Sequence, residues 1–287
     1  MFFLLKRYYH LFLFGAAVLL GAVMFFSVSD GNLRVWALDV GQGDAVFIET
    51  PGKRQVLIDG GPNAKVLSEL SAVMPFYDKS IDLMVLTHPQ EDHIFGLVEV
   101  LKRYQVANVL MTAVAYHTAT YEEFKKLLQE EGARVFIARA GQNIKLDTQT
   151  TLDVLYPFEG LLGREIPEDL VNDTSVAVRL TFGEKKFLFL GDATLKEEVE
   201  LVNSGQDIDV DVLKLSHHGS KTSSSQLFLE KTTPAIAFAS LGRNNRYGHP
   251  HQDVVERLKD ISFYRTDASG RITIVSDGKR VEVETER

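Results

Sequence analysis

Several apolar runs in this sequence end on a histidine or an aspartate, and this pattern constrains the fold more than any other feature. IDLMVLTH ends on His88, KKFLFLGD on Asp192 and VDVLKLSH on His217. Short apolar runs bounded by Gly and Pro turns are typical of buried strands. Side chains in the loops that leave strands commonly form functional sites, so we expect these residues to lie close together.

The order of the predicted elements indicates two similar halves. The first half opens with β-rich runs at 33–38, 44–50 and 54–59. It continues with a strand at 81–88, a helix at 94–104 and a strand at 107–112. The second half opens with strands at 175–182 and 185–192, and helices and strands then alternate. In both halves the strands come first and the helices follow. This order predicts an α/β protein with two sheets packed face to face and helices outside, an αββα sandwich.

Two helix starts carry the residues of a capping box, in which a Thr and a Glu three positions later satisfy free backbone donors. Thr120 with Glu123 predicts a helix at 121–131. Thr194 with Glu197 predicts another helix directly after Asp192.

The composition describes a folded globular protein and excludes several kinds of site. The chain has 287 residues, 45% of them hydrophobic, and contains no cysteine. Disulfides, thiolate metal ligands and a cysteine nucleophile are therefore excluded, which leaves imidazole, carboxylate and amide groups as metal ligands. The formal net charge of -8 provides no overall basic field, so contact with nucleic acid would require a local cluster of Lys and Arg.

The N-terminus has the pattern of a segment directed to a membrane. Lys6 and Arg7 precede an uncharged run of 18 residues at 11–28, which reaches the lower limit for crossing the hydrocarbon core. The positive residues before this run predict a single-pass protein of the cell membrane whose remaining chain is exported. We therefore divide the chain into an anchor at 1–29 and one domain at 30–287. Small residues near the end of the apolar run leave a cleaved signal peptide as the alternative.

The stretch HPQEDH places two histidines and two acids within six positions at the end of a predicted strand. His88 can point out of the sheet edge, while Asp92 and His93 return on the first turn of the next helix. These three side chains, with the strand-end residues Asp192 and His217, are the arrangement that a two-metal hydrolase requires. A proline-started helix cap is the alternative interpretation, but it does not explain the two histidines.

A series of motifs resembles the metallo-β-lactamase-like domain of ComEC-type DNA-uptake proteins. In order along the chain they are LDVGQGDAVFIE, LIDGG, LTHPQEDHIFGL, NDTSVAVRLTFGEKKFLFLGD, VLKLSHHGSKTSSS, GRNNRYGHP and YRTDASGRITI. The resemblance covers 33–275. It implies the αββα metallo-β-lactamase fold. It also implies metal-dependent hydrolysis of phosphodiester bonds in DNA on the outer side of the membrane, and we expect this DNA to be single-stranded. A DNA-uptake channel protein is the implied partner, because the channel that accompanies this domain in the family is absent here.

The resemblance also assigns metal ligands in this chain. They are His88, Gln90, Asp92, His93, Asp192 and His217, with His218 as the alternative to His217. Gln90 stands where the family motif has an aspartate, and an amide oxygen binds a hard cation more weakly than a carboxylate does. Asn172 and Asp173 stand where zinc-dependent relatives carry a further histidine. The implied cofactor is one or two divalent ions, zinc or manganese, with magnesium possible.

The implied chemistry is attack of a metal-activated hydroxide on phosphorus. The expected catalytic residues are Asp92, His218 and His249, the last as a phosphate ligand or proton donor at the mouth of the site. The expected substrate contacts are Ser220, Lys221, Arg243 and Arg246, for which a solvated loop is the alternative.

Three further acids are expected to have structural roles. Asp59 should form hydrogen bonds near the metal site. Asp39 and Asp44 should fix the turn around GQG, with the alternative that they line the cleft. For the function, two alternatives to a nuclease remain open: a hydrolase of a small phosphodiester, lactone or β-lactam, and a catalytically weak domain that binds DNA or a protein partner.

Overall fold

The computed structural model describes residues 8–16 and 30–287, which fall into two units, Met1–Gly31 and Asn32–Arg287. In the first unit residues 8–16 are helical. The predicted anchor at 11–28 lies largely outside the described residues, and no helix among those described is long and apolar enough to cross a bilayer. The anchor stays a prediction from the sequence.

The second unit contains a mixed sheet of eight strands, in the order β15-β14-β1-β2-β3-β4-β5-β6. Its strands are β1 (Leu33–Ala37), β2 (Val46–Glu49), β3 (Gln55–Ile58), β4 (Ser80–Leu86), β5 (Gln105–Met111), β6 (Arg134–Ile137), β14 (Ile272–Ser276) and β15 (Val281–Thr285). Strands β3, β4, β5 and β6 are parallel, whereas β1 and β2 form an antiparallel meander with β3.

A second sheet has seven strands, in the order β13-β12-β11-β10-β9-β8-β7. Its strands are β7 (Asn143–Lys145), β8 (Thr150–Tyr156), β9 (Ala177–Phe182), β10 (Lys185–Phe189), β11 (Val212–Lys214), β12 (Ile236–Ala239) and β13 (Ser262–Arg265). Strands β10 to β13 are parallel. The residues that follow β10, β11 and β12 therefore emerge at one edge of this sheet.

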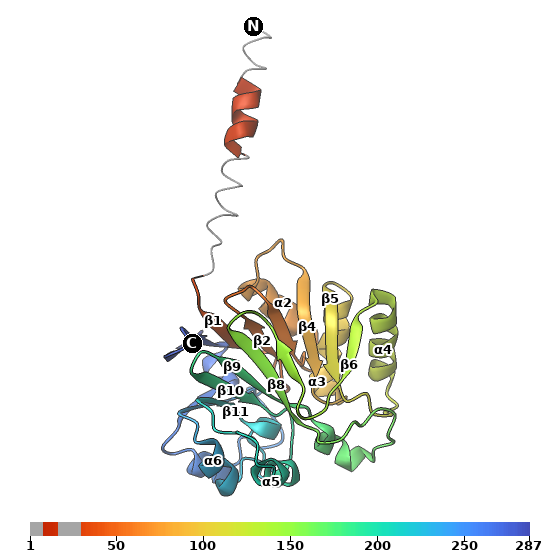
Figure 1. Ribbon diagram of the computed structural model, residues 1–287, viewed down its shortest axis with the longest axis vertical. Coiled ribbons are helices and arrows are strands. Elements are labelled where there is room, and N and C mark those ends of the chain that lie inside the picture. Colours follow the sequence, from red (N-terminus) through yellow and green to blue (C-terminus); the bar gives the residue numbers. More distant parts are fainter. Residues whose placement is uncertain (1–7, 17–29) are drawn as a thin grey trace. The chain divides into compact units, whose positions relative to one another are not determined.

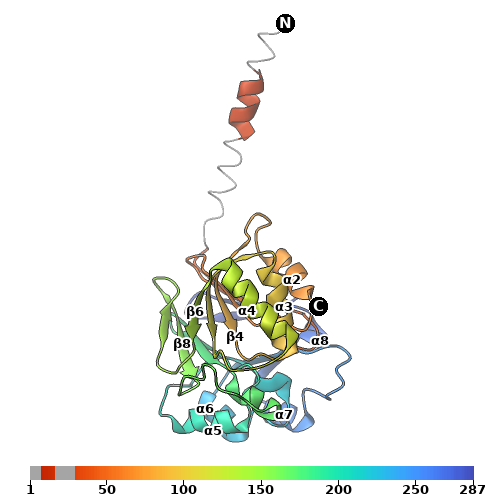
Figure 2. The same ribbon diagram turned by 90° about the vertical axis from the view of Figure 1, so that its right-hand side faces the viewer.

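Helices cover the outer face of each sheet, as the two views in Figure 1 and Figure 2 show. On the eight-stranded sheet they are α2 (Lys65–Val73), α3 (Glu91–Leu101) and α4 (Ala119–Glu131). On the seven-stranded sheet they are α5 (Leu195–Asn203), α6 (Gln226–Thr232) and α7 (Gln252–Arg257). The short helix α8 (Thr266–Ser269) and two 3-10 segments, η1 (Glu168–Thr174) and η2 (Ser216–Gly219), complete the described elements.

Three layers of buried apolar side chains hold these elements together. One lies between the sheets and includes Val85 and Phe187. Another lies between the eight-stranded sheet and its helices and includes Phe124. The third lies on the outer face of the seven-stranded sheet and includes Phe228. Apolar faces on both sides of each sheet explain why the strands read as near-continuous hydrophobic runs. The predicted αββα sandwich is confirmed.

The C-terminal strands β14 and β15 return to the first sheet beside β1. One detail of the sequence prediction is corrected. The capping box at Thr120 is wrong: α4 begins at Ala119, and the hydroxyl of Thr118 accepts the bond from the Tyr121 amide. Thr118 is the last residue with extended backbone, so its side chain is the one that faces the free donors. The box of Thr194 and Glu197 is confirmed.

Helix α3 lies directly on the loop after β3, and glycines make this approach possible. The Gly60 amide donates to the His93 carbonyl at 2.7 Å, and the Gly96 amide donates to the Gly61 carbonyl at 2.9 Å. A Cβ atom on Gly96 would lie 1.8 Å from the Gly60 carbonyl oxygen, which no side-chain movement can relieve. This contact sets the position of the first turn of α3.

Replacing Gly96 by alanine is expected to destabilise the protein by about 1–3 kcal/mol or more, because the helix must move off the loop to make room for the new methyl group. Chemical denaturation would measure the loss. Gly160→Ala is the matched control, because no atom lies within 4 Å of the position its Cβ would take. Equal stability of the two variants would contradict this account of the contact.

Candidate metal centre

Two residues of the site, Asp92 and His93, lie in the first turn of α3. Gln90 is the extended residue directly before this helix. His93 is fully buried, and its Nδ1 atom lies 2.8 Å from Asp59 Oδ2. Asp59 also accepts bonds from the amide and hydroxyl of Thr87, at 2.9 and 2.6 Å. The expected role of Asp59, a structural acid beside the site, agrees with these contacts.

Asp192 follows β10, next to Gly191, whose backbone lies against Thr87 at the end of β4. Gly191 has φ +55°, and a Cβ there would lie 2.7 Å from the Thr87 Cβ, so only glycine fits. The Asp192 amide donates to Ser175 Oγ at 3.1 Å, which directs the carboxylate towards α3.

His217 and His218 follow β11 in an unusual backbone conformation. Both have left-handed dihedrals, with φ values of 48° and 53°. Such a conformation is costly for residues other than glycine and is found mainly where a functional site requires it. It turns the two adjacent imidazoles in different directions, and only His218 is buried.

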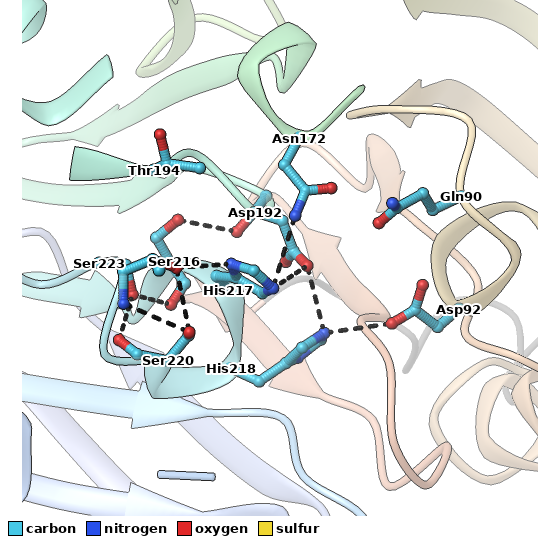
Figure 3. Close-up of polar contacts among 12 residues, drawn as sticks. Gln90, Asp92, Asn172, Asp192, Thr194, Ser216, His217, His218, Ser220 and Ser223 are labelled. Atoms are coloured by element: carbon cyan, nitrogen blue, oxygen red, sulfur yellow. Dashed lines mark hydrogen bonds and ion pairs between the residues drawn. The ribbon is translucent and has the colours of Figure 1, made fainter. Parts of the chain in front are cut away.

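Figure 3 shows Asp92 projecting from the α3 side and Asp192 and His218 projecting from the seven-stranded sheet towards it. His218 Nε2 lies 3.4 Å from Asp92 Oδ2 and 3.5 Å from Asp192 Oδ2. His93 Nε2 lies 3.4 Å from Asp192 Oδ1 and 3.9 Å from Asp92 Oδ2. Two imidazole nitrogens and two carboxylates therefore surround one point.

This arrangement fits a metal ion. His93 Nε2, His218 Nε2 and Asp192 Oδ1 are buried and have no hydrogen-bond partner among the described residues. Buried polar atoms are rarely left in this state, and a bound ion would satisfy all three. Bonds of 2.0–2.2 Å in a tetrahedral site place neighbouring ligand atoms about 3.4 Å apart, which is close to the separations observed here.

The other nitrogen of each ring is held so that Nε2 is free to bind. His218 Nδ1 lies 3.1 Å from the Ser240 carbonyl oxygen and 3.3 Å from Asp44 Oδ1. In the same way, His93 Nδ1 lies 2.8 Å from Asp59 Oδ2. Carbonyl and carboxylate oxygens only accept, so Nδ1 carries the proton and the Nε2 lone pair faces the cluster. Partners of this kind orient the imidazole ligands of metal sites.

Asp44 belongs to the site, which agrees with the alternative that it lines the cleft rather than with a role in the turn alone. One ligand-type atom from each of Asp44, His93, Asp192 and His218 can be chosen so that all lie within 4.8 Å of one another. We place Asp44 behind the rings, because it contacts Nδ1 atoms and forms a buried ion pair with Lys214. The sequence did not single out Lys214, and nothing in the run VLKLS marks its lysine as different from a surface residue.

Burial and charge oppose each other throughout the centre. Burial by itself raises the pKa of Asp192, but His218 and His93 hold it well below its usual value. Burial by itself lowers the pKa of His218, but Asp192 and Asp44 raise it to about 10. Burial likewise opposes protonation of His93, but Asp192 and Asp59 raise its pKa well above the usual value. Without a metal ion, protons on these histidines balance the carboxylates.

The predicted ligands His88 and Gln90 form a separate, uncharged corner. His88 Nε2 lies 3.1 Å from Gln90 Oε1, and the His88 ring lies 4.1 Å from the His93 ring, centre to centre. Burial and His93 lower the pKa of His88 to about 4, so this imidazole is neutral at neutral pH. Asn172 lies nearby, with Nδ2 3.5 Å from His217 Nε2. This corner offers neutral donors only.

His217 and His249 lie at the outer side of the centre. His217 Nε2 is 3.8 Å from Asp192 Oδ2, and its Nδ1 is 3.2 Å from Thr222 Oγ1. His249 is half-buried, and its ring lies 5.8 Å from that of His217 and 6.5 Å from that of His218. The sequence placed His217 among the ligands with His218 as the alternative, and His218 also among the catalytic residues. The geometry places His218 at the centre and His217 beside it.

The four predicted substrate contacts fall into two groups. Ser220 is buried, and its hydroxyl lies 3.0 Å from that of Thr222. Lys221, Arg243 and Arg246 are exposed. The structure therefore brings the three cations to the surface and turns Ser220 inward, where it supports the Thr222 contact with His217.

Metal binding is expected to release protons and to weaken as the pH falls. His218, with a pKa of about 10 in the metal-free site, must lose its proton before Nε2 can bind an ion. Each displaced proton makes the apparent affinity rise roughly tenfold per pH unit below that pKa. Calorimetric titration with manganese in two buffers of different ionisation heat would count the protons, and identical heats in both would contradict the assignment.

The sequence of this chain is similar to those of known proteins. The profile of the metallo-beta-lactamase superfamily matches residues 38–243. The chain is 31% identical over 265 residues to ComE operon protein 3 of Bacillus subtilis (strain 168), with 85% of this chain and 33% of that protein covered. It is 31% identical over 253 residues to competence protein ComA of Neisseria gonorrhoeae, with 86% and 33% covered. The chain thus spans about a third of the length of these relatives.

Among solved structures, the fold is similar to that of the metallo-beta-lactamase fold protein YhfI from Bacillus subtilis. The TM-score is 0.52 and the sequence identity 15%, with 81% of this chain and 95% of that chain covered. At this identity the similarity concerns the fold alone.

Proposed function

Because this chain belongs to the metallo-beta-lactamase superfamily of metal-dependent hydrolases and is related to competence proteins, we propose that it hydrolyses phosphodiester bonds in single-stranded DNA. The observation that carries the proposal is the set of buried, unpartnered atoms on His93, His218 and Asp192, which fits a metal ion. A nearby surface loop carries exposed arginines. Zinc or manganese suits the mixture of imidazole and carboxylate ligands.

The chain's own residues would act as follows. His93, His218, Asp92 and Asp192 hold the ion, which when bound supplies an acidified water and stabilises charge on phosphate oxygens. Asp59 and the Ser240 carbonyl fix the two rings. The outer position of His249 suits contact with the substrate. Burial together with His218 and His217 lowers its pKa to about 4, so its imidazole is neutral at neutral pH, which suits binding of the substrate rather than proton donation.

Phosphate recognition is proposed for the loop after β12. The chain as a whole has a formal charge of -8, so it attracts DNA only where basic side chains gather. Arg243 and Arg246 are exposed on this loop, and Lys221 is exposed on the loop after η2. Arginine binds phosphate with two parallel hydrogen bonds, which suits a polyanionic substrate.

The location is proposed from the sequence. The apolar run at 11–28 behind Lys6 and Arg7 favours a membrane anchor with the hydrolase domain on the outer side. A channel protein for DNA uptake remains the proposed partner. Protease accessibility of the domain in intact cells and in spheroplasts would test the orientation.

The proposed activity is tested with the full chain in detergent, loaded with manganese or with zinc. Three substrates are compared: a labelled single-stranded oligonucleotide, the same sequence as a duplex, and a small chromogenic phosphodiester. We expect cleavage of the single strand that stops on chelation and returns with the metal. Hydrolysis of the small diester alone, or bound metal without any hydrolysis, would favour the small-substrate and binding-domain alternatives respectively.

A further inference from the structure

An exposed tyrosine continues the row of rings that leads out of the metal centre. The Tyr247 ring lies 5.7 Å from the His249 ring at an interplanar angle of 25°. The His249 ring in turn lies 6.5 Å from the His218 ring at 26°. Tyr247 is nevertheless 72% exposed, so its outer face is open to solvent. The row therefore runs from a residue of the metal centre to an open aromatic surface.

The loop that carries Tyr247 is anchored at both ends. At its start, the Gly242 amide donates to Gln42 Oε1 at 3.1 Å. At its end, the side chain of Asn245 binds both the amide and the carbonyl of His249, at 2.9 and 2.8 Å. The residue after Pro250 donates to the Gly219 carbonyl at 2.8 Å. A tyrosine held on such a loop presents its face at little cost in conformational entropy.

The surroundings of the ring are basic. Arg243 and Arg246 lie on the same loop, are exposed, and form no ion pair within the part of the chain that the structure describes. The guanidinium group of Arg257, in contrast, donates a hydrogen bond to the Ser224 carbonyl at 2.9 Å. An open aromatic face beside unpaired guanidinium groups is the combination that binds single-stranded nucleic acid, with bases on the ring and phosphates on the cations.

We propose that Tyr247 is a nucleobase subsite, on which a base of the substrate strand stacks while its phosphates contact Arg243 and Arg246. This inference rests on the proposed function and specifies the substrate as an unpaired strand. The ring lies within about 12 Å of His218 along the row, close enough for the same nucleotide or its neighbour to reach the metal centre. A base inside a duplex is covered on both faces by its neighbours, so the ring would select single strands or frayed ends.

Another exposed aromatic pair of the domain lacks these features. Phe76 and Tyr77 lie in the segment before β4, and their rings meet edge to face at 5.3 Å. Strand β4 runs away from this segment towards His88, so the pair lies at the opposite end of the sheet from the metal centre. Tyr77 is 54% exposed and serves as a matched control for loss of a surface aromatic ring.

The test is equilibrium binding of a fluorescein-labelled deoxythymidine oligonucleotide to the full chain, with chelator present so that no cleavage occurs. Oligonucleotides with one abasic site, placed at each position in turn, report which base is stacked. The wild type should bind one of these oligonucleotides, the one that lacks the stacked base, about tenfold more weakly than the parent strand. Tyr247→Ala should lose about tenfold on the parent strand and should no longer distinguish that position, whereas Tyr247→Phe and Tyr77→Ala should match the wild type.

The outcomes separate this inference from the proposed function. If the wild type cleaves DNA but Tyr247→Ala still distinguishes the abasic position, the subsite is overturned and the nuclease stands. If Tyr247→Phe is as weak as Tyr247→Ala, the hydroxyl binds rather than the ring face, which also overturns stacking. If the wild type neither binds nor cleaves the oligonucleotide, the proposed function fails and the subsite fails with it.

Discussion

Replacing Asp192 by asparagine is expected to empty the metal centre and to abolish hydrolysis. Asp192 contacts both ligand histidines, with Oδ1 3.4 Å from His93 Nε2 and Oδ2 3.5 Å from His218 Nε2. Asparagine has the same shape but removes the charge and one acceptor oxygen, leaving Asp92 as the only carboxylate on the Nε2 side of the rings. Activity should fall on the order of a thousandfold or more, because the ion supplies several kcal/mol of transition-state stabilisation.

Elemental analysis after equilibration with manganese measures the first effect, and oligonucleotide cleavage the second. Asp211→Asn is the matched control: Asp211 lies at the opposite end of β11 and accepts bonds from the Lys186 amide and the Lys185 ammonium group. It should retain the metal content of the wild type. A variant at Asp192 that keeps its metal would show that the ion is held elsewhere.

Replacing Lys214 by methionine is expected to cost about 3–5 kcal/mol of folding free energy, the cost of breaking one side of a buried ion pair. Lys214 is 2% exposed, and its ammonium group binds the Asp44 carboxylate and, at 3.0 Å, the Gly191 carbonyl. Burial by itself raises the pKa of Asp44, and Lys214 and His218 hold it below the usual value. Without Lys214, Asp44 would remain as a buried charge with one partner fewer.

Denaturant unfolding of metal-free protein measures this cost separately from metal binding. The double variant Asp44→Asn, Lys214→Met should recover much of the stability, because it removes both charges together. Lys185→Met is the matched control, since its pair with Asp211 is partly exposed, at 22% and 28%, and such pairs contribute about 0–1 kcal/mol. If the variants at Lys214 and Lys185 lost equal free energy of unfolding, burial would not make the pair of Lys214 with Asp44 more important for stability than an exposed pair.

The sequence predicted the architecture because the relevant signals are local. The run FLFLG at 187–191 is apolar on both faces, which is what a strand covered on both sides requires. His88, Asp92 and His93 stand at the end of β4 or in the first turn of the next helix, and Asp192 stands at the end of β10. This spacing places each group at the edge of its own sheet, and the packing of the two sheets brings the groups together. Glycines such as Gly191 and Gly96 mark where backbones approach, although the sequence does not reveal the partner.

The tertiary structure decided which groups face the ion. His217 and His218 are adjacent and chemically identical. Only their left-handed backbone and the carbonyl of Ser240, the residue after β12, turn the Nε2 atom of His218 towards Asp192. Asp44 and Lys214 are 170 positions apart, and neither carries a local signal of the pair.

The sequence by itself determined the two layers of strands, the helices outside them and the edge at which the site lies, because hydrophobic period and turn residues act over a few positions. The tertiary structure alone determined the orientation of each imidazole, the buried pair behind the rings and the stack from His218 to Tyr247. These depend on contacts between the two sheets and between distant loops, where packing and burial rather than local backbone preference fix the geometry.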